Sequence, residues 1–495
     1  MPIMDEPTSL DPQIADSNSE KLVAANCYEG LVRIMADGTI GKGVATAWNI
    51  SDDGLTYTFK LRNNSHWAMF SGHKAVLGEN YEDTFDITVK AEDFKFGIER
   101  TLSEQTGSAD APLFSAVKSI STPDDFTIVF NLSYADDNFL YALTNPGAMP
   151  CDEEFFKLTN GKYGLDAKYL LCNGPFHVSK WTEKTSVKLV KNNEYNGESS
   201  VSPSSVTFYI NNNDSEVADK MNSVTYDVAF LSSSQFSSIE NKKDLNSVAV
   251  QNVTYSFIFN QNDNNYRNKN MRLAFCRSCD TSSLFDSQSD ITKADGIVPP
   301  SCKIGGEDYR NGNAAELLSY DETLAKKNFN DALLELGSSS VETTILCTEQ
   351  YESFVKQMVQ KLQKTLGVKF VSTVKVVSES DLEAAVNDGN YSVAFYPFKA
   401  KSSFAGEIIE GFDQNNIFGY ESDVLSQKIR NIKNNSGSLE GERSAVADAE
   451  NYLVSEAVIM PVFYENSYFV TSKKTSGIYF YSSADNVCFI NAKKS

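Results

Sequence analysis

The chain has 495 residues, with 44 Lys or Arg against 66 Asp or Glu, and a formal net charge of −22. This length corresponds to about three domains at roughly 100–200 residues each, and a hydrophobic content of 41% is enough to give them cores. A surface so acidic repels nucleic-acid phosphates at long range, which argues against nucleic-acid-binding functions. No stretch approaches the ~18–20 apolar residues that a membrane-spanning helix needs.

The predicted elements alternate between strands and helices along the chain. Residues 54–62 alternate apolar and polar side chains after a turn signal at 51–54, as a half-buried strand does. Residues 91–100 change to helical spacing and carry acidic residues in the first turn, which the helix dipole favours. Further strands are expected at 126–132, 176–181, 187–190, 206–210 and 393–396, and helices at 351–366 and 444–457. Such alternation favours a layered α/β fold.

Four polar or glycine-rich segments lack either periodicity. Residues 38–43 contain three glycines but not the frame of a phosphate-binding loop, so we interpret them as a turn. We expect solvated loops at the polar runs 232–238, 262–270 and 431–438.

The residue types for catalysis are sparse. The three histidines, His66, His73 and His177, are too few to favour a histidine-dependent nucleophile or a histidine-rich metal site. Cys276 and Cys279 have the spacing of a redox or zinc pair, but no second pair exists, so a local disulfide or free thiols remain alternatives. Glycosidase-type carboxylate pairs stay open among 66 acidic residues. We predict no metal, no cofactor and no catalytic residue.

A series of motifs in order carries more information than any single one. They are SLDP (9–12), YEGLV (28–32), ATAW (45–48), SDDGLTYTFKLR (51–62), KAEDF (90–94), NGPF (173–176), NNEY (192–195), MRLAF (271–275) and AVIMPVFY (457–464). This series resembles the extracytoplasmic solute-binding proteins of ABC importers, in the oligopeptide-, dipeptide- and nickel-binding family 5. The resemblance covers nearly the whole chain and is most specific at 51–62.

The resemblance implies an α/β fold of the periplasmic-binding-protein type, a type II two-lobed clamp with an extra inserted domain. Domain I would be discontinuous, formed by residues 1–31, 169–254 and 461–495. Domain II, residues 32–168, would be inserted into it, and domain III, residues 255–460, would form the other lobe. The segments near 255 and 460 would act as hinges, and closure would be a population shift driven by the ligand.

The implied function is capture of oligopeptides and their delivery to an ABC permease in the membrane, without a chemical reaction. The protein would be a monomer in the periplasm or on the outer face of the cell membrane, tethered there by a lipid anchor that this sequence does not include. Alternatives are an oligosaccharide or another small solute as ligand, an extracellular hydrolase, or a scaffold without a ligand. In peptide-binding relatives the ligand is extended and pairs through its main chain, so side chains are read loosely.

The resemblance also implies which residues face the ligand. Domain I would contribute Ala15, Asp16, Ser17 and Asn18 together with Leu231, Ser232 and Ser233, and domain III would contribute Phe395, Tyr396, Pro397, Phe398, Lys399 and Lys401. The rings of Phe395, Tyr396 and Phe398 would suit the sugar-binding alternative as a stacking platform.

One departure from the family pattern concerns the ligand's amino terminus. Peptide-binding relatives usually place an aspartate just after the domain III strand, where it pairs with the α-amino group. Residues 397–404 contain no acid, and Lys401 stands about where that aspartate would be. A cation there repels an ammonium group, so we expect acidic, N-blocked or reversed peptides, or a non-peptide ligand. The alternative is that Lys399 and Lys401 are surface lysines of a differently aligned loop.

Overall fold

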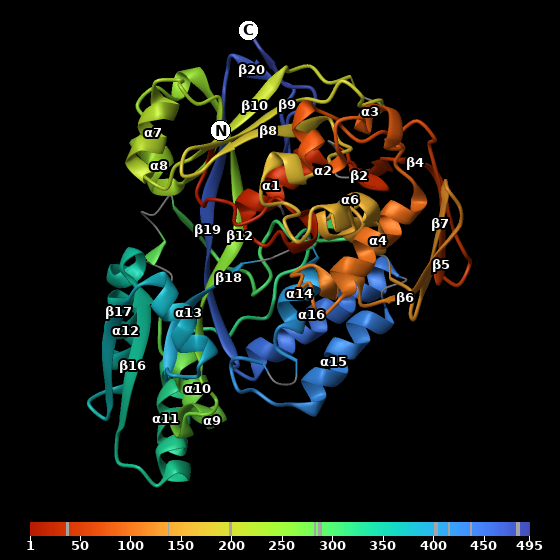
Figure 1. Ribbon diagram of the computed structural model, residues 1–495. Helices are drawn as coiled ribbons and strands as arrows, with labels where there is room; N and C mark the ends of the chain where they lie inside the picture. The colour runs from red at the N-terminus through yellow and green to blue at the C-terminus, as the bar shows by residue number, and fades with distance from the viewer. Residues whose placement is uncertain are drawn as a thin grey trace. The chain divides into compact units, whose positions relative to one another are not determined.

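The computed structural model describes residues 1–35, 39–136, 138–197, 200–281, 284–285, 290–399, 404–413, 416–435, 438–481 and 486–495. The chain divides into two compact units, unit 1 (Met1–Ala249 and Tyr468–Ser495) and unit 2 (Val250–Ser467) (Figure 1). In these described ranges no helix combines the length and the apolar character needed to cross a membrane.

Unit 1 is built on two four-stranded sheets, in the orders β1-β10-β9-β8 and β4-β5-β7-β6. The strands of the first are β1 (Pro2–Ile3), β8 (Phe176–Thr182), β9 (Ser186–Lys191) and β10 (Ser205–Ile210). The strands of the second are β4 (Ala45–Ile50), β5 (Thr56–Leu61), β6 (Val117–Asp124) and β7 (Thr127–Leu132). Unit 1 also contains small two-stranded ribbons. They pair β2 (Val32–Ile34) with β3 (Ile40–Lys42), β20 (Thr475–Ser476) with β23 (Lys493–Lys494), and β21 (Tyr479–Tyr481) with β22 (Asn486–Cys488).

The helices of unit 1 are mostly short. They are α1 (Asn18–Cys27), α2 (Lys74–Leu77), α3 (Tyr81–Thr84), α4 (Ala91–Leu102), α5 (Phe139–Ala142), α6 (Glu153–Leu158), α7 (Asp214–Asn222) and α8 (Ser233–Ser238), with the 3₁₀ turn η1 (Pro12–Ile14) ahead of α1. The apolar stripe of α4 explains its position, because Phe94 and Ile98 are fully buried while Glu92 and Glu99 are exposed on the opposite face.

Unit 2 is a mixed sheet covered by helices on both faces. Its strand order is β19-β12-β18-β16-β17, with β13 on the outer side of β19. The strands are β12 (Leu245–Phe259), β13 (Ile291–Lys293), β16 (Val341–Thr348), β17 (Phe370–Val377), β18 (Val393–Lys399) and β19 (Ile459–Ser472), with the ribbon β14 (Lys303–Ile304) and β15 (Glu307–Asp308). The helices are α9 (Asn264–Arg267), α10 (Lys269–Arg277), α11 (Glu322–Leu336), α12 (Glu352–Leu366), α13 (Glu379–Asn387), α14 (Ala405–Glu410), α15 (Asp423–Asn434) and α16 (Leu439–Ser455).

Strand alternation separates two cores in unit 2. Phe257 and Phe259 of β12 face the core formed with α10, α11 and α12, whereas Ile258 between them faces the core formed with α13 to α16. The central strands are therefore apolar on both faces, as expected for a sheet sandwiched between helices.

The boundary between the units falls inside two long strands. Ala249 and Val250 are both in β12, and Ser467 and Tyr468 are both in β19, next to β12 in strand order. Strand β11 (Val228–Ser232) borders β19 on its other side. The boundaries predicted near 255 and 460, and the further division of unit 1 into domains I and II, stay predictions.

The strongly periodic segments fold as expected, and several polar ones do not. Strands β5, β7, β8, β9, β10 and β18 and helices α4, α12 and α16 lie where the sequence predicts them. The predicted loop at 232–238 is wrong, because Ser232 caps α8 in a reciprocal arrangement with Gln235. The predicted loop at 262–270 is also wrong, since Asp263 and Asn268 are the N-caps of α9 and α10.

Two further turn or loop predictions need correction. Residues 40–42 of the predicted turn at 38–43 are β3, which pairs with β2 in the register Ile34 to Ile40; residue 38 lies outside the described residues. The predicted loop at 431–438 begins as the last turn of α15, which runs to Asn434, and residues 436–437 lie outside the described residues.

Candidate functional site

The predicted ligand-facing segment of unit 1, residues 15–18, joins η1 to α1. Ala15 is buried, Asp16 and Asn18 are exposed, and Ser17 is half-buried. Ser17 is the N-cap of α1, and its side-chain oxygen accepts a hydrogen bond from the Glu20 N–H at 3.2 Å. The Ser17 hydroxyl is therefore committed to the helix, which leaves the side chains of Asp16 and Asn18 as the groups this segment offers to solvent.

The Glu20 side chain holds this segment in place through hydrogen bonds to its main chain. Its carboxylate accepts the main-chain N–H groups of Asp16 and Ser17 at 3.0 and 3.2 Å, and both the N–H and the hydroxyl of Thr8 at 2.8 Å. Burial raises the pKa of this carboxyl, but the hydrogen bonds from Asp16, Thr8 and Ser17 outweigh burial, so the pKa of Glu20 is lowered. The ionised carboxylate thus fixes both ends of the turn that carries the segment.

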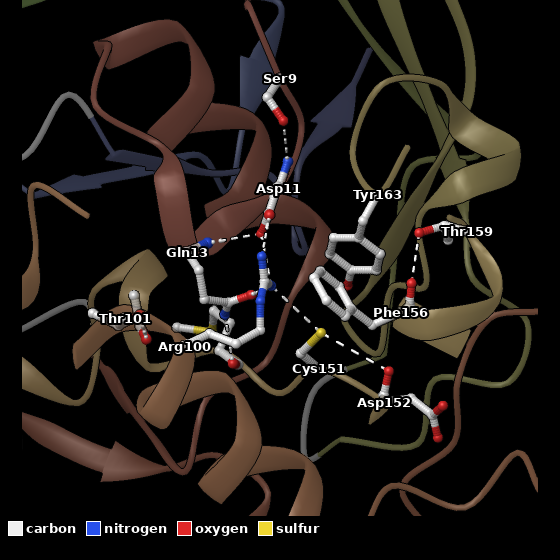
Figure 2. Close-up of polar contacts among 12 residues, drawn as sticks. Ser9, Asp11, Gln13, Arg100, Thr101, Cys151, Asp152, Phe156, Thr159 and Tyr163 are labelled. Atoms are coloured by element: carbon white, nitrogen blue, oxygen red, sulfur yellow. Dashed lines mark hydrogen bonds and ion pairs between the residues drawn. The ribbon is translucent and has the colours of Figure 1, made fainter. Parts of the chain in front are cut away.

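A buried ion pair anchors the chain just before the segment. Asp11 accepts a bidentate pair of hydrogen bonds from the Arg100 guanidinium, at 3.2 and 2.5 Å (Figure 2). Asp11 also accepts the Gln13 N–H at 3.1 Å as the N-cap of η1, and the Ser9 hydroxyl accepts the Asp11 N–H at 3.1 Å. A bidentate arginine–carboxylate pair fixes orientation as well as distance.

Arg100 makes further contacts besides those with Asp11. It donates to the Gln13 side-chain oxygen at 2.6 Å and stacks over the Phe156 ring, 4.1 Å from the ring centre. Gln13 in turn donates to the Met149 carbonyl at 2.9 Å. These contacts tie the SLDP motif to α4 and to the segment before α6. The position from which residues 15–18 start is therefore fixed.

The second predicted segment of unit 1, residues 231–233, leads from β11 into α8. The Leu231 side chain is 1% exposed and lies in a core cluster with α7 and α8, so its side chain is not available to a ligand. Ser232 accepts the Gln235 N–H at 3.2 Å as an N-cap, and Ser233 is buried. This segment offers a ligand mainly its backbone at the start of a helix.

The predicted segment of unit 2 is β18, which is antiparallel to β12 and parallel to β16. Phe395 is 1% exposed, and its ring lies among those of Tyr255, Phe257 and Phe463. Tyr396 and Phe398 point to the opposite face, where their rings meet edge to face at 5.7 Å. The predicted three-ring platform is therefore wrong, because Phe395 cannot share a face with its neighbours.

The hydrogen-bond register of β18 shows which main-chain groups leave β12. Asn260 donates to the Ser392 carbonyl at 3.0 Å, and the pairing continues unbroken to Val253 opposite Lys399. Bonded and non-bonded positions alternate along an antiparallel pair. The main-chain groups of Phe395 and Pro397 therefore point away from β12, which suits proline because it has no N–H to donate.

On that outward side of β18, pairing with β16 involves Val393 and Ala394. Within the described residues, the Phe395 and Pro397 carbonyls lie past the end of this pairing. Lys399, the last residue of β18, is exposed. Lys401 lies outside the described residues, so its predicted role stays a prediction.

The cysteine pair singled out by spacing is buried in unit 2. Cys276 is on α10 and Cys279 follows the helix, and both line a cavity of about 220 Å³ with residues of β19. Burial raises the pKa of both thiols to about 12, so they are neutral at physiological pH and poor metal ligands. Among the described residues no three or more His, Cys, Asp or Glu side chains group as a metal site.

Sequence reasoning missed the residues that position the unit 1 segment. Asp11 and Arg100 are 89 positions apart, and no local pattern connects them. The available signals were the Asp-Pro pair, which is typical of an N-cap followed by a first helical position, and Glu20 three residues after Ser17, the spacing of a capping box.

Comparison with known proteins identifies the family. The model for the middle region of bacterial extracellular solute-binding proteins, family 5, matches residues 39–418. The dipeptide-binding protein DppE of Bacillus subtilis is 24% identical across 96% of this chain and 88% of its own length. The oligopeptide-binding protein OppA of the same organism is 26% identical across 74% of this chain and 68% of its own.

Solved structures agree on the fold. OppA of Listeria monocytogenes, bound to peptide, superposes with a TM-score of 0.77 at 21% identity, covering 100% of this chain and 98% of that one. AgaA from A. tumefaciens R10, in complex with agropinic acid, does so with a TM-score of 0.74 at 17% identity, covering 99% and 97%. The predicted α/β fold class, that of the two-lobed solute-binding clamp, is confirmed. The chain belongs to the bacterial extracellular solute-binding proteins of family 5.

Proposed function

We propose that this protein is a receptor that binds an extended peptide along the outward edge of β18 and delivers it unchanged to an ABC permease. The observation that carries the proposal is the outward direction of the Phe395 and Pro397 carbonyls beyond the pairing with β16. Carbonyls along a strand edge accept main-chain N–H groups of an added strand. Such groups occur in every peptide, so recognition of this kind tolerates many side chains.

Relatives support peptides as the ligand class, since DppE and OppA are named for dipeptide and oligopeptide binding. In this proposal the protein works as a monomer, in the periplasm or lipid-anchored at the outer face of the membrane. The ligand-facing residues would be those predicted from the resemblance, with Phe395 and Leu231 acting through their main chains because their side chains are in cores.

Pro397 makes the edge of β18 short of donors. A ligand carbonyl placed opposite this position finds no N–H, and leaving a buried carbonyl unpaired costs about 1–3 kcal/mol. The exposed Lys399 adds positive charge at the end of the strand. A positive charge at this point repels a free α-amino group of the ligand. We therefore expect the protein to bind acidic or N-blocked peptides.

The second candidate is a non-peptide solute. AgaA has this fold and holds agropinic acid, so the fold accommodates other ligands. The half-buried ring of Tyr396 favours this alternative, because it gives a planar ligand or a sugar a face to stack on, whereas the Phe398 ring already stacks on Phe412.

Calorimetry with one tetrapeptide in free and N-acetylated forms tests the proposal, after native mass spectrometry of the full chain has indicated a ligand length. We expect the acetylated form to bind at least as tightly as the free form. A strong preference for the free amine refutes the expectation that the cationic, donor-poor edge of β18 disfavours a free α-amino group. Binding of sugars or opines without any binding of peptides from a broad panel refutes peptide reception itself.

Pro397→Ala sharpens the test by restoring an N–H at the edge. If peptides pair with β18, one new hydrogen bond of about 1 kcal/mol tightens peptide binding roughly fivefold. Pro123→Ala, at an exposed position in β6 of unit 1, is the matched control and leaves affinity unchanged. Equal affinities of the Pro397→Ala variant and the wild type contradict main-chain pairing at this residue.

A further inference from the structure

A cavity of about 240 Å³ lies in unit 1 at the carboxyl end of α1. Its lining includes Ala25 of α1, residues 28–30 that follow the helix, and all three residues of β2. The carboxyl-terminal segment of the chain contributes Tyr479 and Ile490. Pockets for drug-sized ligands measure roughly 300–1,000 Å³, so this cavity suits a smaller molecule.

The cavity is distinct from the segments predicted to face a peptide. Residues 15–18 lead into α1, whereas the cavity lies where the helix ends. The helix has ten residues, which separate its two ends by about 15 Å. None of the described lining residues belongs to 231–233 or to β18. A molecule in the cavity is therefore a second ligand.

The acidic group of the cavity is Glu29, which is 5% exposed. Its carboxylate forms an ion pair with the Arg62 guanidinium and accepts the Tyr195 hydroxyl at 3.2 Å. The Asn173 side chain accepts the Glu29 N–H at 3.0 Å and donates to the Glu29 carbonyl at 2.8 Å. A carboxylate has about four lone-pair sites, so a firmly held Glu29 can accept a further N–H from a ligand.

The end of α1 adds to this preference for a cation. A helix carries partial negative charge at its carboxyl end. The last turn of α1 contains no basic side chain of its own. An ammonium group placed beside Ala25 and Glu29 is therefore favoured both by the helix and by the carboxylate.

The remaining lining combines one positive charge with apolar side chains. Arg33 of β2 also lines the cavity, and within the described lining Glu29 and Arg33 are the charged residues. Buried apolar residues of the wall include Val32, Met149 and Ile490. The cavity thus presents a carboxylate, a guanidinium and an apolar surface to one small molecule.

We propose that this cavity binds a free amino acid with an apolar side chain. The α-ammonium group of the ligand lies between Glu29 and the end of α1, its carboxylate lies against Arg33, and its side chain packs on the apolar wall. Two opposite charges on the ligand then match two opposite charges of the protein. A monoamine or a monocarboxylate of the same size satisfies only one of them.

Calorimetry on the full chain tests the proposal with L-leucine, 3-methylbutylamine and 4-methylpentanoate, which are leucine, leucine without its carboxylate and leucine without its amino group. We expect one leucine to bind per chain. Each analogue is expected to bind at least about tenfold more weakly, because each loses a charge-assisted hydrogen bond. An analogue that binds as tightly as leucine overturns the proposal, and so does the absence of leucine binding at millimolar concentration.

Arg33→Met separates recognition from support of the fold. This variant is expected to weaken leucine binding at least about tenfold and to leave binding of 3-methylbutylamine unchanged, since the amine has no carboxylate to lose. An equal loss for both ligands overturns the assignment of the ligand carboxylate to Arg33.

Filling the cavity locates the ligand. Ala25→Leu adds three carbons at a half-buried position of α1, where leucine is a good helix former, and is expected to abolish leucine binding. The matched control is Ala75→Leu, at an exposed position of α2 in the same unit, which binds leucine as the wild type does. Unchanged leucine binding by Ala25→Leu overturns the proposal.

Competition distinguishes this cavity from the proposed peptide site. Leucine titrated into protein saturated with the acetylated tetrapeptide is expected to bind with unchanged affinity. Displacement of either ligand by the other means that they share a site, and overturns the proposal. The leucine titrations themselves need no peptide, so failure of the peptide proposal leaves their outcome interpretable.

Discussion

The two units hold their predicted ligand segments in different ways. In unit 1, residues 15–18 are fixed by buried charges, through Asp11 with Arg100 and through Glu20. In unit 2, β18 is fixed by main-chain pairing and by an aromatic core around Phe395. Positioning by charges depends on ionisation and on every partner being present, whereas positioning by apolar packing depends on volume. Substitutions and pH are therefore expected to affect the units unequally.

The largest expected effect is loss of the charge partner in unit 1. Arg100→Met leaves the Asp11 carboxylate buried without its cation and costs about 3–5 kcal/mol of unfolding free energy. The three tryptophans, Trp48, Trp67 and Trp181, are all in unit 1, so fluorescence during urea unfolding reports on it. The control is Lys95→Met on the same helix, whose ion pair with Glu92 is exposed and contributes about 0–1 kcal/mol. Similar losses in both variants remove the distinction.

A smaller effect is expected from acid, again in unit 1. Burial, with a smaller contribution from His177, lowers the pKa of His73 to about 4 against its usual 6.5, despite a hydrogen bond to the Leu170 carbonyl. The unfolded chain then binds a proton that the folded chain refuses, so stability falls between about pH 6.5 and pH 4, by roughly 3 kcal/mol in total.

Urea unfolding followed by tryptophan fluorescence at pH 7 and pH 4.5 measures this loss. Carboxylates also titrate at the acid end, so the informative quantity is the difference between the wild type and His73→Gln. We expect His73→Gln to lose less stability on acidification. An identical pH dependence in the two proteins contradicts a buried neutral His73.

The smallest effect is expected in the core of unit 2. Phe395→Leu keeps most of the apolar volume and costs about 1 kcal/mol, with no dependence on pH between 5 and 8. Hydrogen exchange in α12, which packs on the same core, follows this loss. Val371→Ala, at a 46% exposed position of β17 in the same sheet, serves as control and changes exchange little. A loss above 3 kcal/mol, or one that varies with pH, shows that β18 also depends on charge.

Local periodicity was sufficient for the regular elements. The alternation at 54–62 and the helical spacing at 91–100 come from burying one face, so they are written in consecutive residues. Polar helices such as α8 were missed because capping by Ser232 and Gln235 stabilises them without an apolar stripe. Whether such a polar segment is a loop or a helix depends on which side-chain oxygen accepts which main-chain N–H.

The candidate site was less accessible to sequence reasoning. Alternation predicts that Phe395 and Tyr396 point to opposite faces of β18, but only the packing shows that the Phe395 face is the interior. The Asp11–Arg100 pair joins residues 89 positions apart, and a single sequence does not encode such proximity in any period.

The passage of β12 and β19 through the boundary between the units affects how the chain can be divided. Near this boundary, Gln251 donates to Asn466 at 2.7 Å and Ser467 donates to the Val250 carbonyl at 3.3 Å, so side chains bridge the two strands there. We expect proteases to cleave poorly at this boundary, because proteolysis needs a flexible segment whose backbone is not held by strand hydrogen bonds. Replacing one unit with that of a relative therefore requires two fusion points, one in β12 and one in β19, at positions that lie opposite each other in the sheet.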